Sequence, residues 1–165
     1  MRLNERKLKE QEDNKKLAYL IDLKTICVMD LLSGMALANI AHDTKIDWLE
    51  MNETGRKILF RDKKLRLYLA DVSSEQKTTI SSYCSYVQWV PSSDVVVAQS
   101  RNDLCVWYNI DSPERVTIVP IKGDIIDLEK ADGKTNVIVQ EGVQVILFNF
   151  YYLSILPRNI ALIPI

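Results

Sequence analysis

The chain repeats itself about every 40 residues, a period that few folds accommodate. Trp48 and Trp89 lie 41 positions apart, each inside a short apolar run. Tyr68 and Trp107 lie 39 positions apart in later runs of the same two units. Turn residues separate the apolar runs within each unit, which is typical of β-strands. Roughly 40 residues with three or four strands per unit is the pattern of a β-propeller blade.

The same outline continues in both directions along the chain. Met29 precedes Tyr68 by 39 positions, and apolar runs follow one another again after residue 121. These runs predict strands at residues 17–21, 26–32, 35–40, 46–51, 57–60, 65–69, 86–90, 95–99, 104–110, 116–121, 125–128, 137–139 and 143–148. We therefore expect an all-β chain of about three and a half four-stranded blades. The predicted division is a charged N-terminal arm at 1–16, a partial WD-repeat-like β-propeller at 17–149 and an apolar tail at 150–165.

Composition limits the classes of function. Hydrophobic residues make up 47% of the chain, which is enough for a folded core. The 21 basic residues against 22 acidic ones give a net charge of −1, so we expect no nucleic-acid partner. Three cysteines without a CxxC pair and a single histidine predict no disulfide framework, no metal site and no cofactor. The charged first sixteen residues predict no signal peptide.

Some turns carry traces of a known repeat. Val28-Met29-Asp30 is followed by Ser33-Gly34, and a later unit has Val106-Trp107-Tyr108-Asn109. Ala41-His42 stands just before the next first strand. These residues resemble WD repeats, in which Val-Trp-Asp ends the third strand and Gly-His precedes the next unit. The resemblance implies that His42 forms a structural hydrogen bond within its blade and ties the outer strand to the next one.

A longer resemblance covers about residues 2 to 143. The stretches LAYLIDLKTICVMDLLSG, IDWLEMNETGRKILFRDKKLRL, CSYVQWVP and DLCVWYNIDSPERVT are similar to a second propeller in WD-repeat subunits of the intraflagellar transport B particle. The resemblance implies a non-catalytic interaction scaffold in cilium assembly and ciliary transport, with other B-particle subunits as partners. It places the protein in the cilium, the ciliary base and the cytoplasm. Residues after Val143 do not resemble the family, which predicts a fragment or a divergent ending.

Six basic residues fall within eleven positions, with Asp62 among them, and form the candidate partner-binding set: Arg56, Lys57, Arg61, Lys63, Lys64 and Arg66. They could contact an acidic partner or an anionic membrane surface, so an adaptor of either kind is the alternative function. The plainer interpretation is a solvated loop, because exposure is the usual state of such residues. The apolar run Val143–Pro157 is shorter than the about 20 residues of a membrane helix, which leaves a tail anchor as the alternative to a strand followed by an irregular apolar tail.

Catalysis is a third candidate function. Asp127 and Glu129 alternate along one predicted strand, and His42 offers an imidazole, the most common general base in enzymes, so a propeller hydrolase is the remaining alternative. These groups form no nucleophile–base constellation, and the sequence therefore predicts no enzyme. Trp48, Trp89 and Trp107 recur with the repeat and are expected to fill the gaps between blades.

The chain length bears on association. A seven-bladed ring at this period needs roughly 280 residues, which 165 residues cannot supply. The end blades would then expose apolar edges of the kind that pair with other chains. We expect the isolated chain to self-associate.

Overall fold

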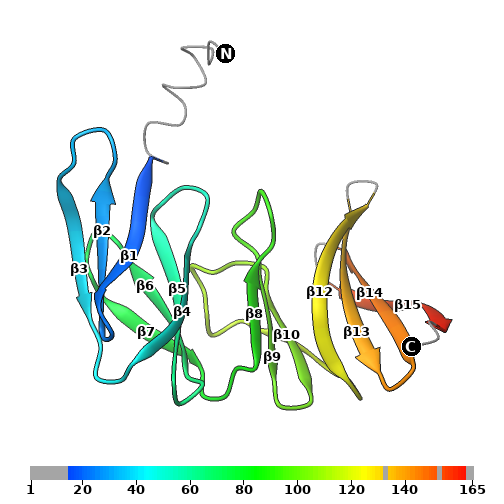
Figure 1. The fold of residues 1–165 in the computed structure, drawn as a ribbon. Helices are drawn as coiled ribbons and strands as arrows, with labels where there is room; N and C mark the ends of the chain where they lie inside the picture. The colour runs from blue at the N-terminus through cyan, green and yellow to red at the C-terminus, as the bar shows by residue number, and fades with distance from the viewer. Residues whose placement is uncertain (1–14, 132–133, 152–153, 163–165) are drawn as a thin grey trace, which may run out of the picture. The chain divides into compact units, whose positions relative to one another are not determined.

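The computed structural model describes residues 15–131, 134–151 and 154–162. Throughout these residues the regular structure consists of β-strands, arranged in one three-stranded and three four-stranded antiparallel sheets (Figure 1). The predicted all-β fold built from four-stranded units is confirmed. The chain divides into two compact units, residues 1–83 and 84–165.

The first unit contains two sheets. Its three-stranded sheet has the order β1-β2-β3, from β1 (Lys16–Asp22), β2 (Thr25–Asp30) and β3 (Ala36–Ala41). Its four-stranded sheet has the order β4-β5-β6-β7, from β4 (Ile46–Met51), β5 (Lys57–Asp62), β6 (Leu67–Asp71) and β7 (Lys77–Ser81). Every neighbour in each sheet is the next strand along the chain, which is the meander of a propeller blade.

Side-chain alternation places the core of this unit between its two sheets. Ile26 and Val28 on β2 are fully buried and point to one face of the first sheet. They belong to one apolar cluster with Ile58 and Phe60 of β5 and with Tyr68 of β6. The core holds the ends of β3 and β5 close together, where the candidate site forms.

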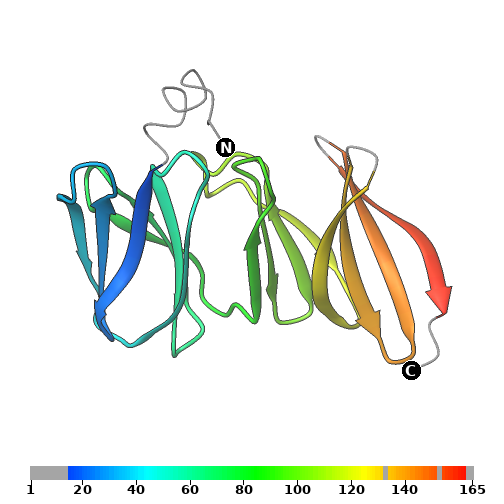
Figure 2. The same ribbon diagram turned by 45° about the horizontal axis from the view of Figure 1, so that its top comes forward.

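The second unit repeats the arrangement. Its first sheet has the order β11-β10-β9-β8, from β8 (Tyr86–Trp89), β9 (Val96–Ser100), β10 (Asp103–Trp107) and β11 (Thr117–Pro120). Its second sheet has the order β12-β13-β14-β15, from β12 (Asp124–Ala131), β13 (Lys134–Glu141), β14 (Gln144–Tyr151) and β15 (Ser154–Leu162). The strands of this last sheet lie side by side in Figures 1 and 2. The core of the second unit contains Val97, Leu104 and Val106 of its first sheet together with Val137 and Val139 of its second sheet.

Two strands, β7 and β15, are missing from the prediction. β7 is absent from the predicted strands because its residues Lys77–Ser81 are polar and largely exposed, so they form no apolar run. The irregular chain predicted beyond residue 148 is wrong, because β14 runs on to Tyr151 and β15 pairs antiparallel with it. Residues 1–14 of the predicted arm lie outside the described residues, and the three-part division of the chain stays a prediction.

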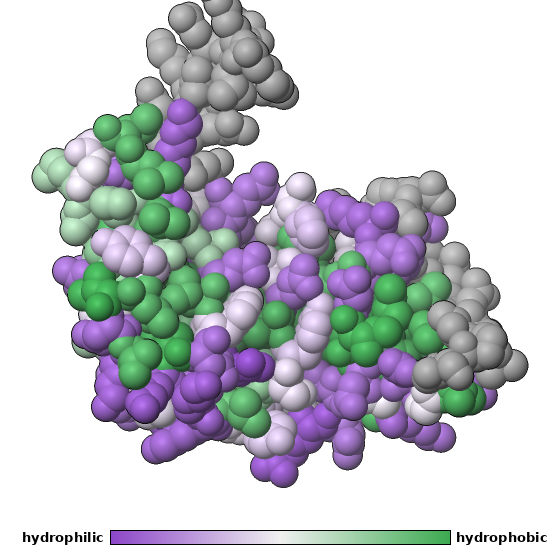
Figure 3. All heavy atoms as spheres, viewed as in Figure 1, coloured by the Kyte–Doolittle hydropathy of each residue, from purple (hydrophilic) through white to green (hydrophobic). Residues whose placement is uncertain are grey.

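Apolar side chains remain exposed on the first sheet. Leu17 and Ile21 of β1 are 44% and 55% exposed, and Leu37 of β3 is 45% exposed. Figure 3 shows this apolar surface over the strands of the first sheet. In the part of the chain that the structure describes, no helix has the length and apolar character needed to cross a membrane.

Candidate functional site

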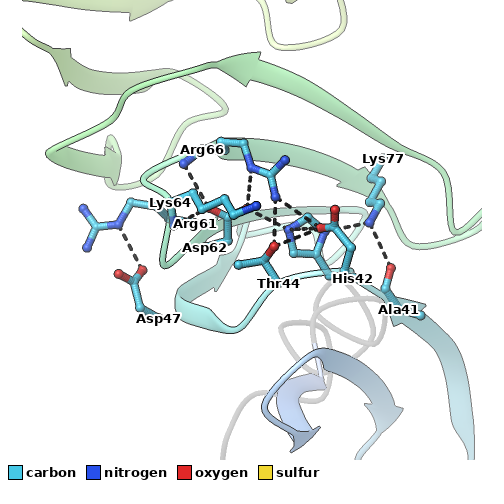
Figure 4. Close-up of polar contacts among 10 residues, drawn as sticks. Ala41, His42, Thr44, Asp47, Arg61, Asp62, Lys64, Arg66 and Lys77 are labelled. Carbon is cyan, nitrogen blue, oxygen red and sulfur yellow. Dashed lines mark hydrogen bonds and ion pairs between the residues drawn. The ribbon is translucent and has the colours of Figure 1, made fainter.

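His42 lies in the short linker that leaves β3 and enters β4. Its side chain is 1% exposed, and its Nε2 lies 2.9 Å from Oδ2 of Asp62 (Figure 4). Asp62 is the last residue of β5, and its side chain is fully buried. The contact therefore joins the linker after the first sheet to the second strand of the next one.

The His42 ring is enclosed on its other sides as well. Its centroid lies 5.1 Å from that of Phe60 and 4.6 Å from that of Tyr68, both in edge-on geometry. Nζ of Lys77 lies 2.7 Å from Nδ1 of His42 and donates to the carbonyl oxygen of Ala41 at 3.0 Å. An ammonium group only donates, so Nδ1 accepts and the Nε2–H of His42 donates to Asp62.

Asp62 also shapes the β5–β6 turn. Its Oδ1 accepts the backbone N–H groups of Lys64 and Arg66, at 2.9 and 3.1 Å. Its Oδ2 accepts Nε of Arg66 at 2.8 Å. Burial opposes the charge of this carboxylate, but the hydrogen bonds from His42 and Arg66 outweigh it and hold the pKa of Asp62 below its usual value. Leu65 adopts a φ of 63°, a conformation that this network holds in place.

Arg66 extends the network to the linker. Its Nη2 donates to Oδ1 of Asp43 at 3.2 Å and to Oγ1 of Thr44 at 3.0 Å. Its guanidinium carbon also lies 5.6 Å from the centroid of the Tyr68 ring, a cation–π distance. Burial opposes the charge of Asp43, but the charge of Arg66 lowers its pKa. The turn, the linker and the second sheet are thus held by one set of polar contacts.

A metal ion is a poor fit for this cluster. His42, Asp43 and Asp62 offer ligand atoms that lie within 4.8 Å of one another. The Arg66 guanidinium, however, donates to both carboxylates, and the Nε2–H of His42 points at Asp62. A divalent cation would have to displace these donors and sit beside a fixed positive charge.

The structure separates the six basic residues of the predicted partner-binding set. Arg56 and Lys57 lie at the start of β5, whereas Arg61, Lys63, Lys64 and Arg66 lie at its other end. Consecutive turns of an antiparallel meander occupy opposite ends of the shared strand. The six residues therefore do not form one surface.

Acidic neighbours occupy three of the six. Nζ of Lys57 lies 2.9 Å from Oδ2 of Asp71, and Nε of Arg61 lies 3.0 Å from Oδ1 of Asp47. Arg66 is bound by Asp62 and Asp43 as described above. The hydroxyl of Ser73 and the ammonium of Lys57 lower the pKa of Asp71 well below its usual range. Arg56, Lys63 and Lys64 are exposed.

The three tryptophans occupy different environments. Trp89, at the end of β8, is 5% exposed, and Trp107, at the end of β10, is 2% exposed. Nε1 of Trp107 donates to the carbonyl oxygen of Pro113 at 2.9 Å. Trp48 on β4 is only half-buried. Trp89 and Trp107 are thus core residues within their unit, and Trp48 is less buried than either.

Sequence reasoning missed two polar residues that join neighbouring sheets. Lys77 contacts His42 from a polar strand that no apolar run marks. Gln99 of β9 is 2% exposed, and its Oε1 accepts the backbone N–H of Ile125 at 2.8 Å. Its Nε2 donates to the carbonyl oxygen of Gly123 at 3.2 Å. The sequence contains a signal for Gln99: a glutamine within an apolar run is expected to be buried, and a buried glutamine needs hydrogen-bond partners.

Comparison with known proteins places these sheets in a family. The model of the IFT80 second beta-propeller matches residues 13–136. The chain belongs to this family. It is 67% identical over 148 residues to the intraflagellar transport protein 172 homolog of Danio rerio, and 58% identical over 148 residues to that of Homo sapiens. It is 53% identical over 138 residues to intraflagellar transport protein 172 of Chlamydomonas reinhardtii.

These matches cover most of this chain but only a small part of each relative. They cover 90%, 90% and 82% of this chain, but the chain spans about 8% of the length of each relative. The similarity to intraflagellar transport WD-repeat proteins predicted from the sequence is confirmed, as is the β-propeller nature of the fold.

Solved structures agree on the fold. The dihydro-heme d1 dehydrogenase NirN matches with a TM-score of 0.67 at 14% identity, covering 93% of this chain and 35% of that one. The β-propeller domain of Cps50 (Swd1) from Myceliophteria thermophila matches with a TM-score of 0.62 at 10% identity, covering 90% of this chain and 55% of that one. At such identities the likeness concerns the fold alone.

Proposed function

We propose that the chain acts as a non-catalytic interaction scaffold in intraflagellar transport, as part of a subunit that resembles intraflagellar transport protein 172. The observation that carries this proposal is the identity of 53–67% to relatives of that name over most of the chain. Its partners are other subunits of the intraflagellar transport B particle. Its proposed locations are the cilium, the ciliary base and the cytoplasm.

The polar chemistry of the site supports a structural role over a catalytic one. The His42–Asp62 pair is buried, with both side chains at most 1% exposed, so a substrate cannot reach it. Asp127 and Glu129 of β12 are exposed on their strand rather than gathered in a cleft. A hydrolase would need accessible acid and base groups at a shared position.

Co-purification tests the scaffold proposal. A tagged form of the chain, expressed in ciliated cells, should co-purify with other intraflagellar transport proteins identified by mass spectrometry. The Cps50 β-propeller domain with the same tag is the matched control, because it shares the fold at 10% identity. Equal recovery of transport proteins with the two baits would overturn the proposal.

Self-association of the isolated chain is a second part of the proposal. Leu17 of β1 and Leu37 of β3 are exposed on the first sheet, as is Ile21 near the end of β1. Contact between such faces removes apolar area from water. Light scattering at micromolar concentration should show species larger than a monomer, and Leu17→Glu with Leu37→Glu should reduce them. A monodisperse monomer of the unaltered chain would contradict this part.

A further inference from the structure

The turns at one end of the first unit bring together four lysines that lie far apart in the sequence. We propose that Lys24, Lys45, Lys63 and Lys64, here termed the lysine rim, form a docking surface for an extended acidic segment of a partner protein. This surface goes beyond the proposed function, because it names where and with what chemistry a partner would bind. It also replaces the six-residue cluster predicted from the sequence.

Backbone hydrogen bonds place the rim residues side by side. The β1–β2 turn contacts the linker after β3, since the N–H of His42 donates to the carbonyl oxygen of Lys24 at 2.8 Å. The same linker contacts the β5–β6 turn, since the N–H of Lys63 donates to the carbonyl oxygen of Lys45 at 2.8 Å. Three segments between residues 23 and 64 thus meet at one edge, which Figure 3 shows as a hydrophilic band below the first two sheets.

The charges of the rim are available to a partner. Lys24, Lys45, Lys63 and Lys64 are all exposed. Within the described residues, none of these four side chains forms an ion pair. The basic residues beside them differ, because Arg61 is bound by Asp47 and Arg66 by Asp62. Internal carboxylates therefore neutralise the arginines and leave the lysines for an external anion.

The rim is also held in a fixed shape. Asp62 accepts the N–H groups of Lys64 and Arg66 and so closes the turn that presents Lys63 and Lys64 (Figure 4). Oδ1 of Asp22 accepts the N–H of Lys24 at 2.8 Å and closes the β1–β2 turn in the same manner. A surface ordered before binding loses less conformational entropy when a partner docks.

The distribution of acidic groups favours a peptide over a lipid surface. The Asp43 side chain is 70% exposed on the same edge, where it would face the headgroups of an anionic membrane. An extended chain is narrow enough to contact the lysines without breaking the hydrogen bond between Arg66 and Asp43. Lysines also pair with carboxylates singly, which suits a segment with successive Asp and Glu residues.

Fluorescence anisotropy with a labelled oligo-glutamate peptide tests the rim on the full chain, with an oligo-glutamine peptide of equal length as the uncharged probe. Glutamate should bind, glutamine should not, and affinity should fall as salt rises. Two charge reversals, Lys63→Glu with Lys64→Glu and Lys24→Glu with Lys45→Glu, should each weaken binding by about tenfold. Lys122→Glu with Lys130→Glu makes the same change in net charge on exposed lysines elsewhere and should leave binding unchanged.

Several outcomes would overturn the proposal. Unchanged binding after reversal of Lys24 and Lys45 would show that the three turns do not act as one surface. An equal loss in the Lys122 and Lys130 control would reduce the effect to net charge. Binding to vesicles containing phosphatidylserine without binding to the peptide would assign the rim to a membrane. Because the probe is a synthetic peptide, these results are separate from recovery of transport proteins in the co-purification.

Discussion

Nε2 of His42 and Oδ2 of Asp62 lie 2.9 Å apart, although the residues are 20 positions apart in the chain, His42 in the linker after β3 and Asp62 at the end of β5. Both side chains are removed from water. A charge buried in this way is favourable only while its partners stay in place. Loss of either side chain therefore leaves the other buried without this partner.

Asp62→Ala removes the common acceptor of His42, Lys64 and Arg66. Breaking a buried ion pair from one side typically costs about 3–5 kcal/mol, and we expect a loss of unfolding free energy of that size. Asp43→Ala is the matched control, because Asp43 also contacts Arg66 but is exposed, and its removal should cost much less stability than that of Asp62. The unfolding free energies of the two variants, measured by urea unfolding, should differ. Similar losses would show that Asp62 contributes no more to stability than Asp43 does.

His42→Ala should destabilise the segment between Met35 and Met51 by about 1–3 kcal/mol, because Asp62 and Lys77 each lose a buried partner. His42→Gln keeps a side-chain N–H that can reach Asp62 and should recover part of the loss. Limited proteolysis with thermal unfolding provides the readout. If the His42→Ala variant resisted protease as well as the unaltered chain does, His42 would have no structural role.

Stability should depend on pH through Asp62. Its pKa is lowered in the folded chain, so its ionised form contributes stability above the usual Asp value of about 3.9. That contribution is lost as pH falls through the lowered folded pKa. Asp62→Asn should therefore be less stable near neutral pH and lose less stability than the unaltered chain on acidification below about pH 4. If the unfolding free energies of the two proteins fell in parallel over that pH range, the lowered pKa of Asp62 would be contradicted.

Gly123 should tolerate no side chain. A Cβ there would overlap the backbone carbonyl of Gln140, which cannot move without disturbing β13. We expect Gly123→Ala to cost about 3 kcal/mol or more. Gly142→Ala is the control: its Cβ would meet open space, and its φ of 58° should cost about 1–2 kcal/mol. Equal melting temperatures for the two variants would contradict the close approach between Gly123 and the backbone carbonyl of Gln140.

The sequence allowed the bounds of some strands to be predicted from their apolar runs. β4 begins at Ile46 and ends at Met51, as its apolar run predicts. Leu65 was assigned to a strand on its apolar character, but it lies in a turn with positive φ, and β6 begins at Leu67. Local hydropathy does not report the contacts with Asp62 that hold this turn.

The candidate site could be predicted only in part. His42 was identified, since the repeat resemblance marks its position, but neither Asp62 nor Lys77 could be named as its partner from spacing alone. Lys24 and Lys45 were missed because a charge cluster in sequence contains only neighbours along the chain. Their meeting depends on the packing of three turns, which strand periodicity does not specify.

Replacement of the matching region in a relative tests the central claim most directly. This chain's sequence can be placed in the Danio rerio intraflagellar transport protein 172 homolog, in place of the region to which it is 67% identical. In zebrafish cells lacking that protein, the chimera should join the other transport proteins and restore cilia. A chimera that is expressed at the normal level but neither joins those proteins nor restores cilia would contradict a scaffold role in intraflagellar transport.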